Sequence, residues 1–177
     1  MIFITLDGPS GSGKSYLSEA LKIEGLRVLH ADDFFYPAKE KKHPLAGNFN
    51  APFFIKNILP MALKDQGFYY PAFDCKEQRY FIKYAPPAKI TLLEGSYSST
   101  KLLGSYRDLS LYLKADNKLC KKRVKGRVGP EAYKNFESRW FVDERKYLKK
   151  YKPHKAAIII RNSADLEAAI KNIFNKE

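Results

Sequence analysis

The segment from Gly8 to Ser15 has the residue types and the spacing that bind phosphate. It reads Gly8-Pro9-Ser10-Gly11-Ser12-Gly13-Lys14-Ser15, which fits the pattern of Gly, four residues, Gly, Lys and then Ser or Thr. The glycines allow positive φ and a close approach to a ligand, so successive N–H groups can line an anion-binding cavity. In this pattern the lysine amine reaches the β- and γ-phosphates and the Ser hydroxyl binds Mg²⁺. We therefore predict that Gly8 to Ser15, with the adjacent Tyr16, bind ATP and Mg²⁺.

Acidic residues follow two further apolar segments of the chain. Asp32 and Asp33 follow residues 26–31, and Glu94 follows residues 89–93. Ligands of open parallel sheets bind at the carboxyl ends of the strands, so we expect these acids beside the phosphates. Asp32 is then suited to accept a proton from an attacking hydroxyl, and Ser15, Asp32 and Glu94 to hold Mg²⁺. Two alternatives stay open: a turn or helix cap at Asp32-Asp33, and an ion pair between a buried Glu94 and Lys14.

A basic stretch later in the chain is typical of a lid that closes over phosphate. Six cations precede a break at Gly126, Gly129 and Pro130, and we place the lid at about residues 121–133. Arg123 and Arg127 are the strongest candidates for catalysis, because a guanidinium binds phosphate in a bidentate manner. The alternative is a solvated basic helix. The six cations are Lys118, Lys121, Lys122, Arg123, Lys125 and Arg127.

The elements that position these residues alternate between strands and helices. This pattern predicts an α/β fold of the P-loop NTPase type, with a five-stranded parallel sheet, helices on both faces and a lid, in one domain of residues 1–177. Residues 68–84 are expected to form a short hairpin or an ordered loop. The expected strands are 2–6, 26–31, 89–95, 108–114 and 156–160. The expected helices are 16–23, 52–64 (ended or kinked by Pro60), 117–125, 131–151 and 164–174, the last capped by Ser163.

The composition restricts the class of protein. The net charge of +13 and the pI near 9.6 would attract polyanions, but no nucleic-acid-binding signature accompanies the charge. We therefore favour solvated helix faces and a triphosphate site over nucleic-acid binding, which stays an alternative. The absence of a long apolar run and of a signal peptide predicts a cytoplasmic protein without a membrane span, in which Cys75 and Cys120 are free thiols. A homo-oligomer stays open.

Taken together, these segments resemble the uridine kinase and phosphoribulokinase-like branch of the P-loop kinases, which includes nicotinamide riboside kinase and bacterial pantothenate kinase. The resemblance covers nearly the whole chain, and short bacterial uridine-kinase-like proteins resemble it most. Beyond the P-loop it is carried by Asp32-Asp33-Phe34-Phe35, Asn48-Phe49-Asn50, Tyr70-Pro71-Ala72-Phe73-Asp74-Cys75, Glu94-Gly95-Ser96-Tyr97-Ser98, the basic lid at Arg123 and Arg139-Trp140.

The resemblance implies roles for individual residues. It makes Asp32 the catalytic base, and it implies an acceptor pocket lined by Asp32, Phe35, Tyr36, Asn48, Asn50, Tyr70, Phe73, Asp74 and Arg79. Asn50 stands where the family has an acid that binds sugar hydroxyls, and the base-contacting histidine expected after Asp74 is absent. Asp74 is therefore the strongest candidate for binding acceptor hydroxyls, with capping of the turn after Pro71 as its alternative.

Three functions are compatible with these residues. The leading hypothesis is an ATP-dependent kinase of a small molecule, with a hydroxyl of a nucleoside or ribosyl compound as acceptor. The second is a nucleic-acid-associated P-loop protein or a polynucleotide 5′-hydroxyl kinase that uses the basic surface. The third is a nucleotide sensor without catalysis, against which the intact set of Lys14, Ser15 and Asp32 argues.

Overall fold

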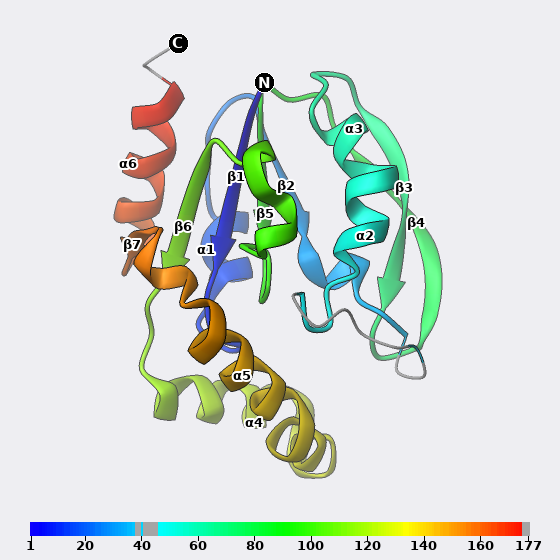
Figure 1. The fold of residues 1–177 in the computed structure, drawn as a ribbon, viewed down its shortest axis with the longest axis vertical. Helices are drawn as coiled ribbons and strands as arrows, with labels where there is room; N and C mark the ends of the chain where they lie inside the picture. Colours follow the sequence, from blue (N-terminus) through cyan, green and yellow to red (C-terminus); the bar gives the residue numbers. More distant parts are fainter. Residues whose placement is uncertain (38–39, 41–45, 175–177) are drawn as a thin grey trace.

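The core of the molecule is a five-stranded parallel sheet. The computed structural model describes residues 1–37, 40 and 46–174, and Figure 1 shows their arrangement. The strands lie in the order β2-β5-β1-β6-β7, and every neighbouring pair runs parallel. This confirms the predicted sheet. Its strands are β1 (Ile2–Asp7), β2 (Leu26–His30), β5 (Ile90–Glu94), β6 (Leu109–Leu113) and β7 (Ile158–Ile160).

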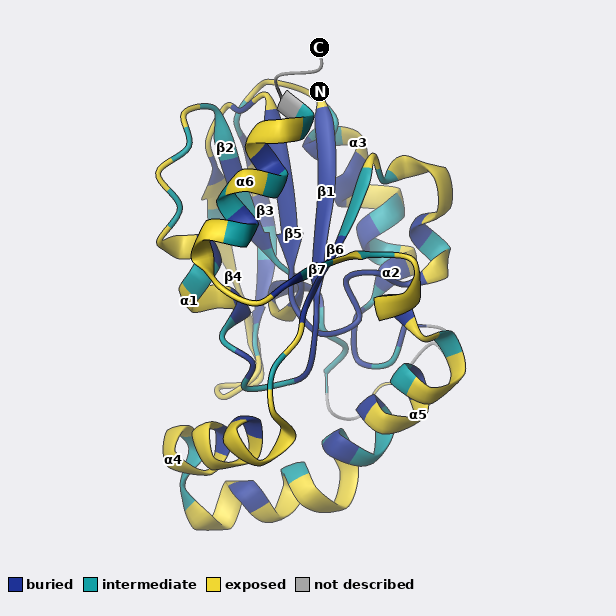
Figure 2. Cartoon of the chain, turned by 90° about the vertical axis from the view of Figure 1, so that its left-hand side faces the viewer, coloured by how far each residue is buried: buried dark blue, intermediate teal, exposed yellow. Residues whose placement is uncertain are grey.

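Helices cover both faces of this sheet, as expected. Alternate residues of β1 point to opposite faces, because successive side chains of a strand alternate. Ile2, Ile4 and Leu6 pack with α1 (Lys14–Glu19) and α6 (Ser163–Phe174). Phe3 packs on the other side with the helical segment 51–62 and the hairpin. Figure 2 shows α1 and α6 on one side of the sheet and α2, α3 and α5 on the other.

The segment between β2 and β5 forms a helix and a hairpin. The predicted helix 52–64 is one helical run whose turns widen before Pro60, a residue that cannot donate a backbone hydrogen bond. Of the two forms expected for residues 68–84, the hairpin is correct: β3 (Phe68–Asp74) and β4 (Arg79–Ala85) pair antiparallel. The helical run consists of α2 (Ala51–Phe53), a π segment (Phe54–Ile58) and α3 (Leu59–Ala62).

Residues 117–151 form a long helical arm below the carboxyl ends of the strands (Figure 1). The arm consists of α4 (Asn117–Asn135), a π turn (Phe136–Trp140) and α5 (Phe141–Tyr151). The expected break is confined to Gly129, whose φ of 78° is not helical. The predicted lid, residues 121–133, therefore lies within α4.

Several boundaries differ from the sequence prediction, most of them by one or two residues. The first helix ends at Glu19 rather than at residue 23. The last strand begins only at Ile158, because a 3₁₀ turn occupies residues 153–155. The last helix is capped not by Ser163 but by Asn162, whose Oδ1 accepts the Asp165 N–H. No helix in the described ranges is both long and apolar enough to span a membrane.

Candidate functional site

The phosphate-binding loop connects β1 to α1 in the predicted strand–loop–helix context. Gly11 and Gly13 have φ of 79° and 102°, which other residues rarely adopt. A Cβ on Gly11 would lie 2.5 Å from the carbonyl oxygen of Cys120 in α4. The glycine is thus required both by its conformation and by the close approach of the lid helix.

Lys14, the predicted phosphate ligand, folds back onto the loop. Its Nζ donates hydrogen bonds to the carbonyl oxygens of Gly8 and Pro9, both at 2.9 Å, and the side chain is buried. Ser15 and Tyr16 follow at the start of α1 and are exposed, so they are accessible to a nucleotide and its metal. Contacts of all three with ATP stay predictions.

The two adjacent aspartates have different surroundings. Both lie in a 3₁₀ turn (Ala31–Phe34), so the turn that we considered does form. Asp33 is buried, and its two carboxylate oxygens accept hydrogen bonds from Tyr70 Oη at 3.0 Å and Lys83 Nζ at 2.7 Å. The Asp32 side chain is exposed, and its carboxylate has no hydrogen-bond donor within the described ranges. Asp32 is therefore the aspartate that is free to act on a ligand.

The environment of Asp32 is typical of a general base. Burial raises its pKa to about 6, and the nearby carboxylate of Glu94 adds to this effect, while the charges of Lys14 and Arg127 oppose it. The residue is nevertheless exposed to solvent, so a ligand can reach it. A carboxylate with a raised pKa is a stronger proton acceptor than an ordinary aspartate.

Glu94 lies at the carboxyl end of β5, where a metal-binding acid was predicted. Its Oε1 accepts a hydrogen bond from His30 Nδ1 at 2.6 Å, and this contact raises the pKa of His30. The ion pair is thus with His30 and not with Lys14. The buried Oε2 atom has no hydrogen-bond partner in the part of the chain that the structure describes, and a carboxylate oxygen is the kind of ligand that Mg²⁺ prefers. No cluster of three metal-binding side chains is preformed among the described residues, so a metal here would also need ligands from substrate phosphates.

The residues predicted to bind the acceptor fall into two groups. The backbones of Tyr36 and Asn48 are hydrogen-bonded to each other, and Phe35 packs edge-on against Tyr97. Asn48 is buried, and its Oδ1 atom has no partner. With Tyr70 held against Asp33, these residues lie around the turn that carries Asp32.

The second group consists of Asn50 and Asp74, whose side chains bind nearby backbone N–H groups, and of Phe73 and Arg79 in the hairpin. Asn50 Oδ1 accepts the Phe53 N–H and caps α2. Asp74 Oδ1 accepts the N–H groups of Lys76 and Glu77, which lowers its pKa and corresponds to the turn cap that we kept as the alternative. Phe73 is buried against Tyr80, and Arg79 is exposed opposite Asp74 in the hairpin. An acceptor contact at these four positions stays a prediction.

Both lid arginines lie close to the site. Arg123 Nη1 donates to the carbonyl oxygens of Ser12 at 3.1 Å and Gly11 at 3.4 Å. Arg127 is near enough to Asp32 for its charge to lower the pKa of that carboxyl. The structure therefore brings the predicted catalytic residues Lys14, Asp32, Arg123 and Arg127 together. Closure of the lid on a ligand stays a prediction.

Sequence reasoning missed an acidic network beneath the P-loop. Asp7 is 1% exposed and accepts hydrogen bonds from the Gly8 N–H at 2.6 Å and from Tyr147 Oη at 2.7 Å. Burial raises the pKa of Asp7. Glu144, one turn before Tyr147 on α5, accepts the Ser10 N–H at 2.8 Å. No sequence signal connects α5 with a loop more than 130 residues earlier.

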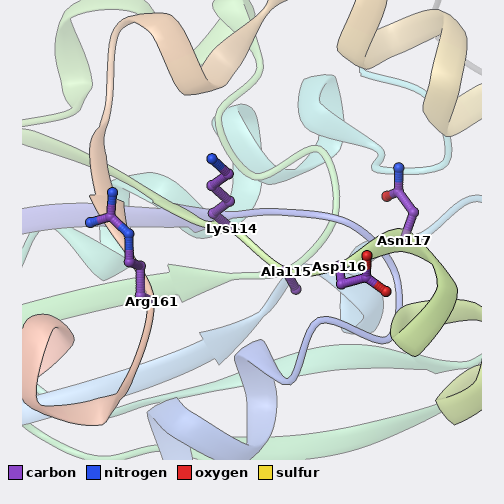
Figure 3. Close-up of a pocket in the computed structure, with 5 residues that line it drawn as sticks. All are labelled: Lys114, Ala115, Asp116, Asn117 and Arg161. Atoms are coloured by element: carbon purple, nitrogen blue, oxygen red, sulfur yellow. The ribbon is translucent and has the colours of Figure 1, made fainter.

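A shallow pocket of about 590 Å³, open to solvent rather than enclosed, lies at the carboxyl ends of β6 and β7 (Figure 3). It adjoins the P-loop, because a Cβ on Gly8 would lie 2.7 Å from the carbonyl oxygen of Leu113, the last residue of β6. Both charged and polar side chains contribute to its wall. Its lining consists of Lys114, Ala115, Asp116, Asn117 and Arg161.

Comparison with solved structures identifies the fold. A possible uridine kinase from Bacillus stearothermophilus matches over 90% of this chain and 88% of its own, with a TM-score of 0.66 and 18% identity. The chain has a P-loop kinase fold. A candidate fructose transport system kinase from Silicibacter sp. TM1040 also matches this fold, over 91% of this chain and 87% of its own, with a TM-score of 0.56 and 21% identity. No family model and no curated protein sequence matches.

Proposed function

We propose that this protein is an ATP-dependent kinase that transfers the γ-phosphoryl group to a hydroxyl of a small nucleoside or ribosyl-type acceptor. One observation carries the proposal. Of two adjacent aspartates, Asp33 is bound by Tyr70 and Lys83, whereas the Asp32 carboxylate accepts no hydrogen bond from any residue that the structure describes. A free carboxylate near Lys14 and Arg127 is what a phosphoryl transfer to an alcohol requires.

The proposed reaction assigns a role to each group. The acceptor hydroxyl gives its proton to Asp32 as its oxygen attacks the γ-phosphorus, and ADP leaves. Lys14 swings out from the loop carbonyls to the β- and γ-phosphates, and Arg123 and Arg127 stabilise the charge that develops on the transferred group. Ser15 and Glu94 would hold Mg²⁺, directly or through water, and the ion would neutralise phosphate charge.

The pocket beside the P-loop is the proposed site of the nucleotide base. It lies past the ends of β6 and β7, on the side of the P-loop away from Asp32 and β5, because β1 separates β5 from β6 in the sheet. The triphosphate would thus run from the pocket along the loop towards Asp32. Asp116, Asn117 and Arg161 offer donors and acceptors to a base.

The acceptor class rests on the residues around Asp32 and on the resemblance to uridine kinase-like proteins. The aromatic rings of Phe35 and Tyr97 and the unpartnered Asn48 Oδ1 combine apolar surface with a polar group, as small-molecule pockets do. One structural neighbour is named a possible uridine kinase and the other a candidate fructose transport system kinase, and the compounds in both names carry hydroxyl groups. We expect a cytoplasmic enzyme, where ATP is available and the free thiols Cys75 and Cys120 persist.

A panel of acceptors tests the proposal. The wild-type protein is incubated with ATP, Mg²⁺ and each of several nucleosides, ribosides, sugars and pantothenate, and both ADP and the phosphorylated acceptor are quantified. We expect one class to give equal amounts of the two products. Formation of ADP at the same rate with and without every acceptor would contradict the proposal.

One observation favours a second function, a polynucleotide 5′-hydroxyl kinase or another nucleic-acid-associated protein. The first ten residues of α4 carry several exposed cations and no acid, and most of α4 is exposed in Figure 2. Binding of a polynucleotide would weaken steeply as salt rises, because counterions are released. Binding of an uncharged acceptor would not, so a salt titration separates the two functions.

A further inference from the structure

An acidic side chain from the helical arm of residues 117–151, called the lid arm below, binds the phosphate-binding loop. Glu144 Oε2 accepts hydrogen bonds from the Ser10 N–H at 2.8 Å and from Ser10 Oγ at 2.6 Å. Ser96 Oγ lies 3.5 Å from the same oxygen. The loop's backbone donors are the groups that bind phosphate in this motif. A carboxylate of the protein itself thus binds one of the loop's backbone N–H groups, at Ser10.

Lys14, the lysine of the P-loop, binds the peptide unit between Pro9 and Ser10 on the side opposite to Glu144. Lys14 Nζ binds the Pro9 carbonyl oxygen at 2.9 Å, and Glu144 binds the N–H of the next residue, Ser10. The Pro9–Ser10 peptide is therefore held by a cation at its oxygen and by an anion at its nitrogen. The three contacts of Lys14 Nζ, with the Gly8 and Pro9 carbonyl oxygens and with Ser12 Oγ, match its three N–H donors, so a phosphate oxygen that binds Lys14 would replace or share one of them.

Glu144 also fixes the position of the arm. Tyr147 lies three residues later on the same face of α5, and its Oη donates to Asp7 Oδ2 at the base of the loop at 2.7 Å. From the other half of the arm, Arg123 binds the carbonyl oxygens of Gly11 and Ser12. The arm thus holds the loop's N–H groups with an acid and its carbonyl groups with an arginine.

This arrangement is electrostatically unfavourable for a bound triphosphate. Glu144 is 8% exposed, and no lysine or arginine of the described ranges forms a salt bridge with it. Repulsion between a poorly solvated carboxylate and phosphate charges is strong, because little water screens it. The carboxylate and the phosphates therefore exclude each other from the loop.

We propose that Glu144 is an internal anion that occupies the P-loop when nucleotide is absent and is displaced by the phosphates of ATP. Its displacement frees α5 from Ser10 at the same time as Lys14 and Arg123 exchange loop carbonyls for phosphate oxygens. Nucleotide binding and the position of the lid arm are thereby coupled. This inference rests on the proposed nucleotide-binding function and adds a regulatory contact to that site.

Nucleotide affinity of matched variants tests the inference. Glu144→Gln keeps the shape and removes the charge, and Glu144→Met also removes the hydrogen-bond acceptor. Glu167→Gln is the control, because it removes the same charge from a partly exposed carboxylate on α6, outside the lid arm, where it pairs with Lys171. The dissociation constants of ATP with Mg²⁺ and of ADP are measured by calorimetry, and folding is checked by the melting temperature.

We expect both Glu144 variants to bind ATP about tenfold more tightly than wild type, within the range of ordinary coupling between sites, and Glu167→Gln to bind like wild type. Unchanged or weaker binding in the Glu144 variants would overturn the inference, and so would equal tightening in Glu167→Gln. Unfolding of both Glu144 variants would also overturn it, because a contact that exchanges with ligand cannot be one on which the fold depends. Failure of the wild type to bind ATP would instead refute the proposed function.

Discussion

The different surroundings of Asp32 and Asp33 predict that two nearly identical substitutions have opposite consequences. Asp32→Asn replaces the carboxylate, which can accept a proton, by an amide, which cannot. The Asp32 carboxylate accepts no hydrogen bond from the described residues, so the substitution breaks no contact there. Loss of a general base lowers kcat by about 10²–10⁴-fold. The fold should be at least as stable as wild type, because burial and the Glu94 charge already disfavour the ionised form of Asp32.

Asp33→Asn should instead damage the fold. The carboxylate accepts hydrogen bonds from Lys83 Nζ at 2.7 Å and Tyr70 Oη at 3.0 Å. Loss of one partner of a buried ion pair costs about 3–5 kcal/mol, and the lower part of this range applies because Lys83 is 35% exposed. We expect a loss of about 3 kcal/mol, which lowers Tm by about 6–12 °C in a chain of this size.

Steady-state kinetics and thermal unfolding of both variants test whether Asp32 serves catalysis and Asp33 serves stability. Ligand-free Tm is measured for wild type, Asp32→Asn and Asp33→Asn, and kcat is measured with the acceptor that the panel identifies, at a temperature at which all three are folded. Asp33→Asn should keep kcat within about tenfold of wild type. The reasoning is refuted if Asp33→Asn loses kcat while Asp32→Asn retains it, or if Asp32→Asn is the less stable of the two.

Four further predictions concern other parts of the molecule. Lys14→Ala should abolish ATP turnover with little change in ligand-free secondary structure, and normal ADP production by this variant would contradict the P-loop assignment. Arg123→Ala and Arg127→Ala should lower kcat more than they weaken ATP binding, because their charges act mainly during transfer; an equal loss in calorimetric affinity would argue against this role. The wild-type kcat/KM should fall about tenfold per pH unit below pH about 6, because Asp32 must be ionised and burial raises its pKa to about 6; a flat profile would exclude it as the base. Arg27→Met should reduce the free energy of unfolding by about 3–5 kcal/mol in urea titrations, because Arg27 is 1% exposed and its guanidinium binds the carbonyl oxygens of residues 62, 64, 66 and 86; a loss below about 1 kcal/mol would show that these contacts are dispensable.

The sequence was sufficient for the parts of the site that depend on local pattern. The order of strands and helices, the P-loop and the acids past β2 and β5 follow from short segments whose periodicity and glycines are visible in the chain. The sequence also suggested the lid arginines, because six cations precede Gly129 in a stretch that is typical of a phosphate-binding lid. These features place Lys14, Asp32, Glu94 and Arg123 in one region.

Contacts between distant segments could not be predicted in this way. Arginine is rarely buried in proteins, yet Arg27 is 1% exposed and binds five oxygen atoms: Thr91 Oγ1 in β5 and the carbonyl oxygens of residues 62, 64, 66 and 86. Glu144 and Tyr147 read as ordinary members of a polar helix, because nothing local shows that α5 returns to the base of the P-loop. Asp33 resembles Asp32 until Tyr70 and Lys83 of the hairpin are in place.

The turn residues show a related difficulty. Asn50 and Asp74 are side chains that bind either a ligand or a nearby backbone N–H, and sequence alone does not decide between the two uses. In the structure one oxygen of each caps a backbone segment. Short polar side chains beside turns are therefore weak predictors of a substrate site, even when a family resemblance supports them.

Transfer of labelled phosphate tests the central claim most directly. The protein is incubated with Mg²⁺, ATP labelled at the γ-phosphate and the acceptor identified by the panel, and the label is followed by separation of acceptor, ATP and inorganic phosphate. The account predicts that wild type moves the label onto the acceptor hydroxyl and that Asp32→Asn does so at least about 100-fold more slowly. Label that remains in ATP, appears only as inorganic phosphate, or reaches the acceptor equally fast in Asp32→Asn would contradict it.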